Sequence, residues 1–387
     1  MRVVLINPSS PFMIDQAVMP PLGLWYVANA LQAHNVTVVD LGLGDTIPEG
    51  ADAYGVTGCS VHLNQMAEIL PQLSGLKVAG GPHATAKPEE LLEMGFDTVV
   101  QGEGDSVISQ IVERGITGII TAPRIRDLDH HFPNRNQEYR YHYQIDGLKT
   151  TTMVTSRGCP WECAFCSKDV YGRVRVTRSA DSVMTEVDSV MRQGYQAVMF
   201  YDDTFMTGRE RLETLCYKFH DRNLVWRCLA RADDADKGIL NLMKASGCRE
   251  IALGVESGSQ TILDNIHKHE TVEQQRRCIQ LAHEVGLRVK AFMIVGLPGE
   301  SQETIAETDK FLEESRPDAV DVNILAVYPG SAIYKNPEAY DVKFGPYHHC
   351  KGRSDAYVCT TSTSNMTSEE ILRAQEMLYT KYARRNA

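Results

Sequence analysis

Residues 150–166 read TTTMVTSRGCPWECAFC: a short β-prone run leads directly into three closely spaced cysteines. Three residues separate Cys159 from Cys163, and two separate Cys163 from Cys166. Three thiolates in one loop can bind three corners of an iron–sulfur cube, which leaves the fourth iron without a protein ligand. A small molecule can then coordinate that open position, as substrate-level chemistry requires. The stretch therefore predicts a reactive metal centre in a loop that follows a strand.

Two other kinds of metal site compete with this interpretation. A structural zinc site needs a fourth Cys or His ligand close by, and an electron-transfer ferredoxin normally has a fourth cysteine as well. The next cysteine is Cys216, beyond the reach of the same loop. The remaining cysteines among the ten are scattered from Cys59 to Cys359, which argues against a disulfide framework. An open cluster is favoured, with a structural metal site as the alternative.

Downstream of the cysteines, strand-like and helix-like segments alternate. The predicted strands are Thr151–Thr155, Ala197–Tyr201, Val225–Ala230, Glu250–Val255, Val289–Val295 and Ala319–Leu325. The predicted helices are Asp181–Gln193, Glu210–His220, Lys237–Ala245, one that a Thr271–Gln274 capping box opens and Gly286 closes, and Gln302–Glu314. Six strands rather than eight predict a partial (β/α)6 barrel over residues 149–330, open on one side. A C-terminal extension over 331–387 ends in a helix that Thr367 and Glu370 cap.

Upstream of the cysteines, residues 1–125 have the rhythm of parallel βαβ units. The predicted strands are Val3–Ile6, Val36–Asp40, Ala53–Thr57, Val78–Ala79 and Thr98–Val100, with an extra one at Ile119–Thr121. The predicted helices are Leu22–Ala33, Leu63–Leu73, Glu89–Met94 and Asp105–Arg114. The fold class is therefore α/β, with a doubly wound, Rossmann-like first domain whose ligands sit at the carboxyl ends of the strands. Residues 126–148 break the rhythm with charged, Asn and aromatic residues and are predicted to be a linker.

Composition narrows the class of protein. The chain has 387 residues, of which 43% are hydrophobic and 23% charged, as in soluble globular proteins. No apolar run approaches the ~20 residues that a membrane-spanning helix needs, and the N-terminus is strand-like rather than a secretory signal. We therefore expect a cytoplasmic protein without a membrane partner. The net charge of −11 makes nucleic acid an unlikely partner.

The cysteine segment resembles the radical S-adenosylmethionine (SAM) superfamily. That family has a C-x3-C-x2-C motif with an aromatic residue before the last cysteine, which stands here as Cys159, Cys163, Phe165 and Cys166. The resemblance covers residues 150–330, including the six-strand barrel. It implies that the three cysteines hold a catalytic 4Fe-4S cluster, which cleaves SAM to a 5′-deoxyadenosyl radical.

The same resemblance implies a set of residues that bind SAM. They follow the second to fifth barrel strands: Asp202 or Asp203 for the amino group, Arg231 for the carboxylate, Glu256 and Ser257 for the ribose, and Gly296 and Pro298 in the turn that contacts the adenine, beside Phe165 in the motif. A carboxylate suits an ammonium group, and an arginine can bind a carboxylate with two donors. Solvated loops and helix caps are the alternative explanation for these residues.

The first domain contains Asn7-Pro8, Pro21-Leu22-Gly23, Gly80-Gly81-Pro82-His83-Ala84-Thr85 and Gly102-Glu103-Gly104. With these segments it resembles the cobalamin-binding domain of a large radical SAM subfamily, whose members include methyltransferases acting on unactivated carbons and the anaerobic cyclase of bacteriochlorophyll synthesis. The residues that this implies for cobalamin are Asn7, Ser60, Gly80, Gly81, His83, Gly102 and Glu103. Glycine turns let the backbone approach a broad, flat cofactor. The Asp-x-His-x-x-Gly motif of many cobalamin proteins is absent, as it commonly is in this subfamily. A nucleotide site is disfavoured, because no G-x-G-x-x-G follows the first strand.

These resemblances imply cobalamin-dependent methylation of an unactivated carbon in a small-molecule or peptide substrate, with an external flavodoxin- or ferredoxin-type reductant. The two domains are expected to face one another across a shared cleft, and Tyr347-His348-His349 in the C-terminal extension either line this cleft or pack the tail. Three alternatives stay open: a radical SAM cyclase or rearrangement enzyme, a cobalamin-free radical SAM enzyme with a vestigial first domain, and an iron–sulfur redox sensor. A methylthiotransferase is excluded, because its first domain needs three more cysteines and only Cys59 is present there.

Overall fold

A six-stranded parallel sheet forms the N-terminal part of the chain. The computed structural model describes every residue except 12, 347–357 and 383–387. The strands of this sheet lie in the order β2-β1-β3-β4-β5-β6, and their bounds are β1 Arg2–Asn7, β2 Asn35–Asp40, β3 Ala53–Thr57, β4 Leu76–Gly80, β5 Thr98–Gln101 and β6 Gly118–Thr121. The chain reverses direction across the sheet between β1 and β3, which is the place where doubly wound sheets bind ligands.

Five short helices cover the two faces of this sheet: α1 Leu22–Ala30, α2 Leu63–Ile69, α3 Pro82–Ala86, α4 Pro88–Met94 and α5 Ile108–Arg114. One apolar core contains residues from α2 and α4, and a second contains residues from α1 and α5. Two separate cores on opposite faces are what a sheet with buried strands on both sides requires. The predicted doubly wound domain is confirmed, and the extra strand at 119–121 is β6.

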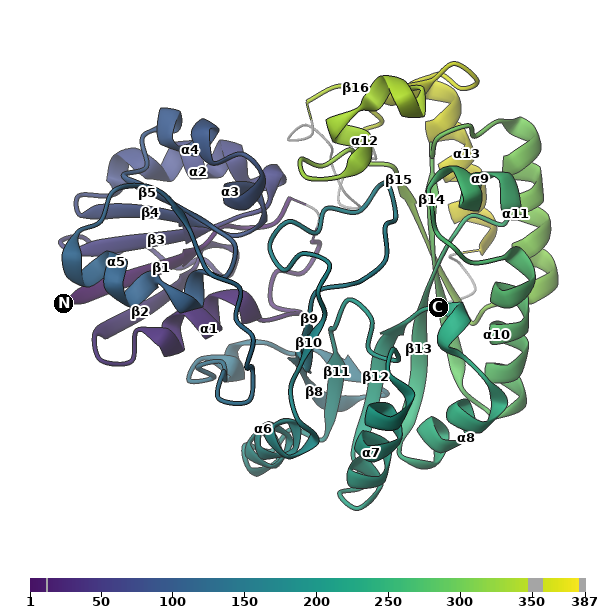
Figure 1. Ribbon diagram of the computed structural model, residues 1–387, viewed down its shortest axis with the longest axis horizontal. Coiled ribbons are helices and arrows are strands. Elements are labelled where there is room, and N and C mark those ends of the chain that lie inside the picture. Colours follow the sequence, from purple (N-terminus) through teal and green to yellow (C-terminus); the bar gives the residue numbers. More distant parts are fainter. Residues whose placement is uncertain (12, 347–357, 383–387) are drawn as a thin grey trace.

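A seven-stranded sheet forms the second part of the chain, in the order β15-β14-β13-β12-β11-β8-β7. Its strands are β7 Gln144–Ile145, β8 Leu148–Met153, β11 Ala197–Phe200, β12 Val225–Ala230, β13 Cys248–Glu256, β14 Arg288–Val295 and β15 Ala319–Ile324. The six strands from β8 to β15 pair in parallel, whereas β7 is antiparallel to β8. Figure 1 shows this sheet curved around an inner space that opens toward the first domain.

Most helices of this half lie on the outer side of the curved sheet: α6 Ala180–Arg192, α7 Arg209–His220, α8 Lys237–Ala245, α10 Val272–Glu284 and α11 Gln302–Ser315. The short helix α9 Gln260–Asn265 packs instead with Ala164 of the cysteine segment and Leu297 in a separate apolar cluster. The long helices have one apolar face, which buries residues such as Leu215, Met243 and Ile279 against the strands. The predicted partial barrel of six β/α units is confirmed. Sequence reasoning missed α3 and α9, which are less than two turns long and have no periodic pattern to detect.

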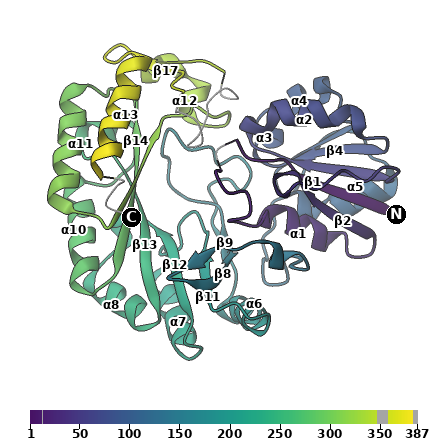
Figure 2. The same ribbon diagram turned by 180° about the vertical axis from the view of Figure 1, so that it is seen from behind.

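The C-terminal extension packs back on the barrel. Its elements are α12 Ala332–Lys335, the antiparallel pair β16 Val342–Phe344 and β17 Thr361–Thr363, and α13 Ser368–Tyr382. Helix α13 lies against β14 and β15 (Figure 2), and Gln375 donates a hydrogen bond to the carbonyl of Val322. The loop Tyr347-His348-His349 lies outside the described residues. No helix in the described part of the chain is long and apolar enough to cross a bilayer.

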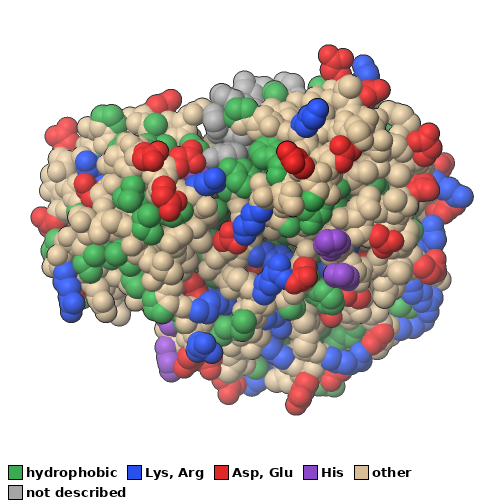
Figure 3. All heavy atoms as spheres, turned by 45° about the horizontal axis from the view of Figure 1, so that its top comes forward, with side chains coloured by type: hydrophobic (Ala, Val, Ile, Leu, Met, Phe, Trp, Pro, Cys, Tyr) green, Lys and Arg blue, Asp and Glu red, His purple; other side chains and the backbone are tan. Residues whose placement is uncertain are grey.

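Charged side chains of both signs are interspersed over the surface that Figure 3 shows, and Lys and Arg gather where the two halves of the molecule meet. The two halves contact each other through buried groups as well. Tyr141 in the segment between the sheets packs edge-on against Trp25 of α1 and donates a hydrogen bond to Asp40.

Candidate active site

The cysteines lie in a long loop that is closed at its base by a short strand pair. Strand β9 (Ser156–Arg157) pairs antiparallel with β10 (Val176–Thr177), and the residues between them form the loop. Gly158 follows β9 with φ of 92°, and a Cβ there would lie 2.5 Å from the carbonyl oxygen of Val174. The amide of Cys159 donates to the carbonyl of Gly172 at 3.3 Å. A glycine is thus needed where the loop closes on itself.

The three cysteines all line one cavity inside the barrel, which we call the barrel cavity; its volume is about 460 Å³. The loop is pinned to the barrel midway, because the amide of Ala164 donates to the carbonyl of Ile266 and the Ala164 carbonyl accepts from Ile333. Phe165, the aromatic residue of the motif, lines the same cavity. The predicted cluster residues are therefore brought to one wall.

The donor set fits a cluster better than a single ion. In the described part of the chain, no three Cys, His, Asp or Glu side chains lie close enough to share one metal ion. Thiolates on a cube each bind a different iron, so they lie farther apart than the ligands of one ion. Burial raises the pKa of the Cys166 thiol to about 12, so the positive charge of bound iron would have to stabilise the thiolate. No fourth cysteine is among the residues that line this cavity.

Two neighbouring aspartates after β11 have different environments. Asp203 lines the barrel cavity, and burial together with the charge of Asp202 raises the pKa of its carboxyl. Asp202 is not part of the cavity wall. Its carboxylate accepts hydrogen bonds from the Thr155 amide at 2.9 Å, the Thr155 hydroxyl at 3.0 Å and the Ser156 hydroxyl at 2.6 Å. Asp202 therefore holds the turn that connects β8 to the cluster loop.

Arg231 also lines the barrel cavity, but much of its guanidinium is already in use. Its Nε and Nη2 donate to the carboxylate of Asp233 at 3.0 and 3.1 Å, and Nη2 donates to the carbonyl of Lys268. The guanidinium lies 4.0 Å from the ring centre of Trp161 in the cluster loop. Arg231 thus stacks against the loop that carries the cysteines, an arrangement that suits a planar cation.

Lys268 is a wall residue that sequence reasoning missed. Its ammonium lies 3.3 Å from Glu256 Oε1 and 4.0 Å from Glu270 Oε2, and all three side chains are buried. Burial opposes its charge, but Glu256 and Glu270 raise the pKa of Lys268 above its usual value. Glu256 has φ of 66° at the end of β13, where the register shifts. Gly254 leaves the room for this pair, since a Cβ there would lie 2.5 Å from Glu256 Oε1 and 3.1 Å from Lys268 Nζ.

The remaining predicted SAM residues do not line the barrel cavity. Ser257 is fully buried, and its hydroxyl lies 3.2 Å from that of Thr308. In the turn after β14, the Gly296 amide donates to the Glu300 carboxylate and the Pro298 carbonyl accepts from Asn265. These residues shape the ends of β13 and β14, and the structure gives each of them a partner within the protein.

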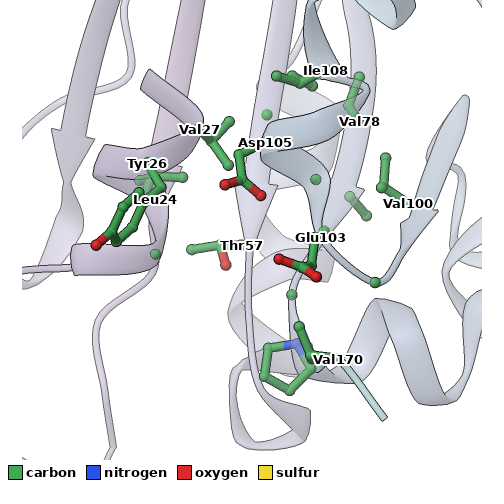
Figure 4. A pocket seen from close by; sticks show the side chains of 18 of the residues that line it. Leu24, Tyr26, Val27, Thr57, Val78, Val100, Glu103, Asp105, Ile108 and Val170 are labelled. Carbon is green, nitrogen blue, oxygen red and sulfur yellow. The ribbon is translucent and has the colours of Figure 1, made fainter. Parts of the chain in front are cut away.

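A second cavity lies in the first domain, at the carboxyl ends of its central strands; its volume is about 290 Å³, and we call it the first-domain cavity. Figure 4 shows its lining, with Leu24 and Val27 of α1 opposite Val100 and Ile108. Four of the residues predicted for cobalamin line it: Gly80, Gly81, Gly102 and Glu103. The glycine turns at the ends of β4 and β5 thus open onto an apolar cavity, as expected for a site that the backbone must approach closely.

The other three residues predicted for cobalamin lie elsewhere. Asn7 donates to Asp40 at the end of β2. The hydroxyl of Ser60 lies 2.8 Å from Nδ1 of His83, and Nε2 of His83 lies 3.3 Å from Glu90. His83 is buried with both ring nitrogens beside these partners, and burial lowers its pKa. None of the three lines the first-domain cavity.

The two cavities adjoin. Pro82 of α3 and Val170 and Tyr171 of the cluster loop line both of them. The barrel cavity is also lined by Tyr201, which directly follows β11, and by Phe292 in the interior of β14. The shared wall places the glycine turns of the first domain and the cysteine loop on the two sides of one boundary, as predicted for domains that face each other.

Both halves of the chain match families of known proteins. The profile of the radical SAM superfamily matches residues 153–312, and that of the B12-binding domain matches residues 16–112. The chain therefore carries a radical SAM domain and a B12-binding domain. It carries both domains of the cobalamin-dependent radical SAM enzymes, whose cofactors are a 4Fe-4S cluster, SAM and cobalamin. These cofactors and the enzyme class are those that the sequence predicted.

Several individual proteins are similar over most of the chain. An uncharacterized methyltransferase of Pyrococcus horikoshii is 26% identical, and the match covers 87% of this chain and 83% of that protein. The hopanoid C-3 methylase of Methylococcus capsulatus is 25% identical, with 86% and 71% covered. The anaerobic magnesium-protoporphyrin IX monomethyl ester cyclase of Cereibacter sphaeroides is 27% identical, but this chain spans only about half of it, 49%, and the match covers 69% of this chain.

Solved structures share the fold. The radical SAM methyltransferase TsrM from Kitasatospora setae, with cobalamin and a 4Fe-4S cluster bound, superposes with a TM-score of 0.73 at 17% identity, over 96% of this chain and 84% of TsrM. The cobalamin-dependent enzyme OxsB with aqua-cobalamin and SAM bound gives 0.68 at 18% identity, over 98% of this chain and 61% of OxsB. At these identities the likeness supports the predicted fold of both domains.

Proposed function

We propose that this enzyme transfers a methyl group to an unactivated carbon of a small molecule or peptide. The observation that carries the proposal is the wall that the two cavities share at Pro82, Val170 and Tyr171. A substrate at this wall would meet both cofactors, one on each side. Relatives named as methyltransferases and methylases cover most of the chain and support the same reaction type.

The barrel cavity supplies the groups for the cluster and SAM. We assign Cys159, Cys163 and Cys166 to three irons, which leaves the fourth open to the amino and carboxylate groups of SAM. Asp203, shortly after β11, is an acidic residue of the cavity wall, and its carboxylate suits the ammonium group of SAM. Lys268 and Glu256 provide a paired cation and anion in the same cavity, where a carboxylate and a ribose can each find a partner. The bound cluster supplies an electron for the reductive cleavage of SAM.

The first-domain cavity supplies an apolar cradle for cobalamin. Gly80, Gly81 and Gly102 bring backbone rather than side chains to the cofactor, and Leu24, Val27 and Val100 line the cavity around it. His83 is held by Ser60 and Glu90, so we do not assign it to cobalt. Bound cobalamin supplies a carrier for the methyl group. The chain's own task is to hold the carrier beside the barrel and to keep water from the boundary.

A corrin-dependent reaction of SAM tests this function without a known substrate. Protein reconstituted with iron, sulfide and cobalamin under anaerobic conditions is mixed with SAM and a low-potential reductant. We expect S-adenosylhomocysteine in proportion to bound corrin, together with slow formation of 5′-deoxyadenosine. The matched control is Gly80→Phe, which fills the first-domain cavity; it should still form 5′-deoxyadenosine but no S-adenosylhomocysteine. Corrin-loaded protein that yields 5′-deoxyadenosine alone would instead support a cyclase or rearrangement enzyme.

A further inference from the structure

Arg157 joins the two cofactor sites. It ends β9 and immediately precedes Gly158 and Cys159, yet its side chain reaches into the first domain. Its Nη1 lies 2.6 Å from Glu103 Oε2 and 3.0 Å from Asp105 Oδ2. All three side chains are buried, with exposed fractions of 3%, 1% and 7%. The side chain of Arg157, at the base of the cluster loop, thus lies among residues of the first-domain cavity. A shift of the loop would therefore move this cavity wall, and a shift of the wall would move the loop.

The carboxylates that hold Arg157 are themselves fixed. Glu103 accepts hydrogen bonds from the Ile125 amide at 3.1 Å and from the Arg124 guanidinium. Asp105 lies 3.6 Å from Nδ1 of His131. Both carboxylates lie in the turn after β5, and both line the first-domain cavity (Figure 4). The resemblance implies that Glu103 binds cobalamin, but both of its carboxylate oxygens already accept hydrogen bonds from protein donors.

The main chain of Arg157 is held from the same side. Its carbonyl accepts a hydrogen bond from Nη2 of Arg124 at 2.8 Å. The guanidinium of Arg157 lies between two aromatic rings, 4.7 Å from the centre of Tyr26 on α1 and 5.4 Å from that of Tyr171 in the cluster loop. Contacts to both domains thus surround one arginine, and both rings belong to the cavity lining.

The ion pairs of Arg157 with Glu103 and Asp105 are costly to break because they are buried. A buried pair that loses one partner leaves an uncompensated charge, which costs far more than breaking an exposed pair. Nη1 alone donates to both carboxylates, while the planar guanidinium lies over the rings of Tyr26 and Tyr171, a contact that an ammonium does not reproduce. We propose that Arg157 is a positioning residue that fixes the separation and orientation of the cobalamin site relative to the cluster loop. The proposal rests on the assignment of the two cofactors to the two cavities, and methyl transfer is not needed for it.

The magnetic interaction between the two cofactors measures their separation directly. A reduced 4Fe-4S cluster and cob(II)alamin each carry an unpaired electron, so electron paramagnetic resonance of the doubly loaded, full-length enzyme reports how they are spaced. In Arg157→Met, which keeps much of the side-chain volume but no charge, we expect the spin–spin splitting to be lost or broadened. Arg157→Lys should restore it in part, because the charge returns without the planar group that contacts Tyr26 and Tyr171.

The control is Arg173→Met in the same loop, whose side chain is 60% exposed and pairs with exposed Glu162; it should give the wild-type splitting. If Arg157→Met loses a cofactor or does not fold, Asp105→Asn keeps the Glu103 contact and should broaden the splitting in its place. Wild-type splitting in Arg157→Met, or in Asp105→Asn where the first variant cannot be loaded, would overturn the proposal. Wild-type protein that does not load corrin or cluster would instead refute the cofactor assignment and with it the proposed function.

Discussion

Adjacent residues can have unrelated tasks, as Asp202 and Asp203 illustrate. The sequence predicts that either Asp202 or Asp203, after the second barrel strand, binds the amino group of SAM, but it does not indicate which one. Only the fold shows that the Asp202 carboxylate accepts three hydrogen bonds from residues 155 and 156, while Asp203 lines the barrel cavity. The direction of a side chain at a strand end depends on the path of the loop, which periodicity does not encode.

Alanine at each position should therefore have a different effect. Asp203→Ala should weaken SAM binding about tenfold to a hundredfold, the effect of losing a charged hydrogen bond of roughly 1.5–3 kcal/mol. Asp202→Ala should lower the free energy of unfolding by roughly 2 kcal/mol or more, since it leaves buried donors of Thr155 and Ser156 unpaired. Anaerobic SAM titration and urea unfolding measure the two effects, and each variant is the control for the other. Equal loss of SAM affinity in both would contradict this division.

The role of Lys268 in the cavity wall could not be predicted from the sequence. It follows the short helix α9 in the run His267-Lys268-His269, where neither neighbour suggests a site. Its partners are Glu256 at the end of β13 and Glu270 just beyond it. A Gly inside the strand, directly after the apolar run Ile251–Leu253, was the signal available, because Gly254 leaves the room in which Lys268 and Glu256 meet. That room is visible only once the strands are paired.

At the scale of elements, strands were predicted closely because each is a short apolar run between turn residues. The bounds of β3, β12 and α8 agree with the predicted ranges. The cysteine loop was harder, because its closure depends on β9 and β10, which have two residues each and no pattern. The motif predicts three cluster ligands but not how the loop closes, which depends on the close approach of Gly158 to the carbonyl of Val174.

Two glycines of this loop offer a matched test of its closure. Gly158 and Gly172 both have positive φ, 92° and 62°, but a Cβ at 172 would meet nothing within 4 Å. Gly172→Ala should cost only the conformational penalty of roughly 1–2 kcal/mol and still bind about four irons per chain. Gly158→Ala should open the base of the loop, displace Cys159 and lower the iron and sulfide content well below that of Gly172→Ala. Equal cluster content in the two variants would show that closure at Gly158 is not required.

The turn after β14 contains a buried carboxyl whose titration should appear in the stability of the protein. Burial raises the pKa of Glu300 to about 7 from an ordinary value of 4.5, although the Gly296 and Leu297 amides favour its ionised form. The folded protein then binds more protons than the unfolded chain between these two values. The contribution of Glu300 is therefore full below pH 4.5 and is lost as the pH rises through 7.

Glu300→Gln removes this titration and keeps a carbonyl oxygen for the two amides. Between about pH 5 and pH 8, wild-type protein should lose about 2–3 kcal/mol of unfolding free energy relative to the variant, since one unit of pKa shift corresponds to about 1.4 kcal/mol. Urea unfolding of both proteins at the two pH values gives the difference, and every other titrating group cancels in it. A difference that does not change with pH would mean that Glu300 ionises normally in the folded state.

At the scale of the whole molecule, the sequence predicted two α/β units that face each other but not what joins them. Arg157 is far in sequence from Glu103 and Asp105. Glu103 is predicted for cobalamin and Asp105 as the first residue of a helix, and neither prediction involves Arg157. Their contact follows from the placement of two complete sheets. Long-range ion pairs of this kind leave no periodic signal in the sequence, so the shared wall of the two cavities became visible only with both folds in place.

The two cofactor sites should be separable despite this contact, because their walls come from different parts of the chain. Among the residues that line the first-domain cavity, Arg157, Val170 and Tyr171 belong to the barrel half and the others precede residue 110. The triple variant Cys159→Ala, Cys163→Ala, Cys166→Ala should therefore lose all cluster iron and still retain cobalamin through gel filtration. Gly80→Phe should do the reverse, because Gly80 lines the first-domain cavity and a Cβ there meets nothing within 4 Å, so the ring fills the cavity without disturbing the backbone.

Gly80→Ala is the matched control, since a methyl group fits that space, and it should keep both cofactors. The corrin absorbance and the iron content of each purified variant give the comparison. Loss of corrin in the cysteine variant would mean that an ordered cluster loop is needed to complete the cobalamin site, through the wall of Val170 and Tyr171. Retention of corrin in Gly80→Phe would place cobalamin outside the first-domain cavity, and the glycine turns would then need another explanation.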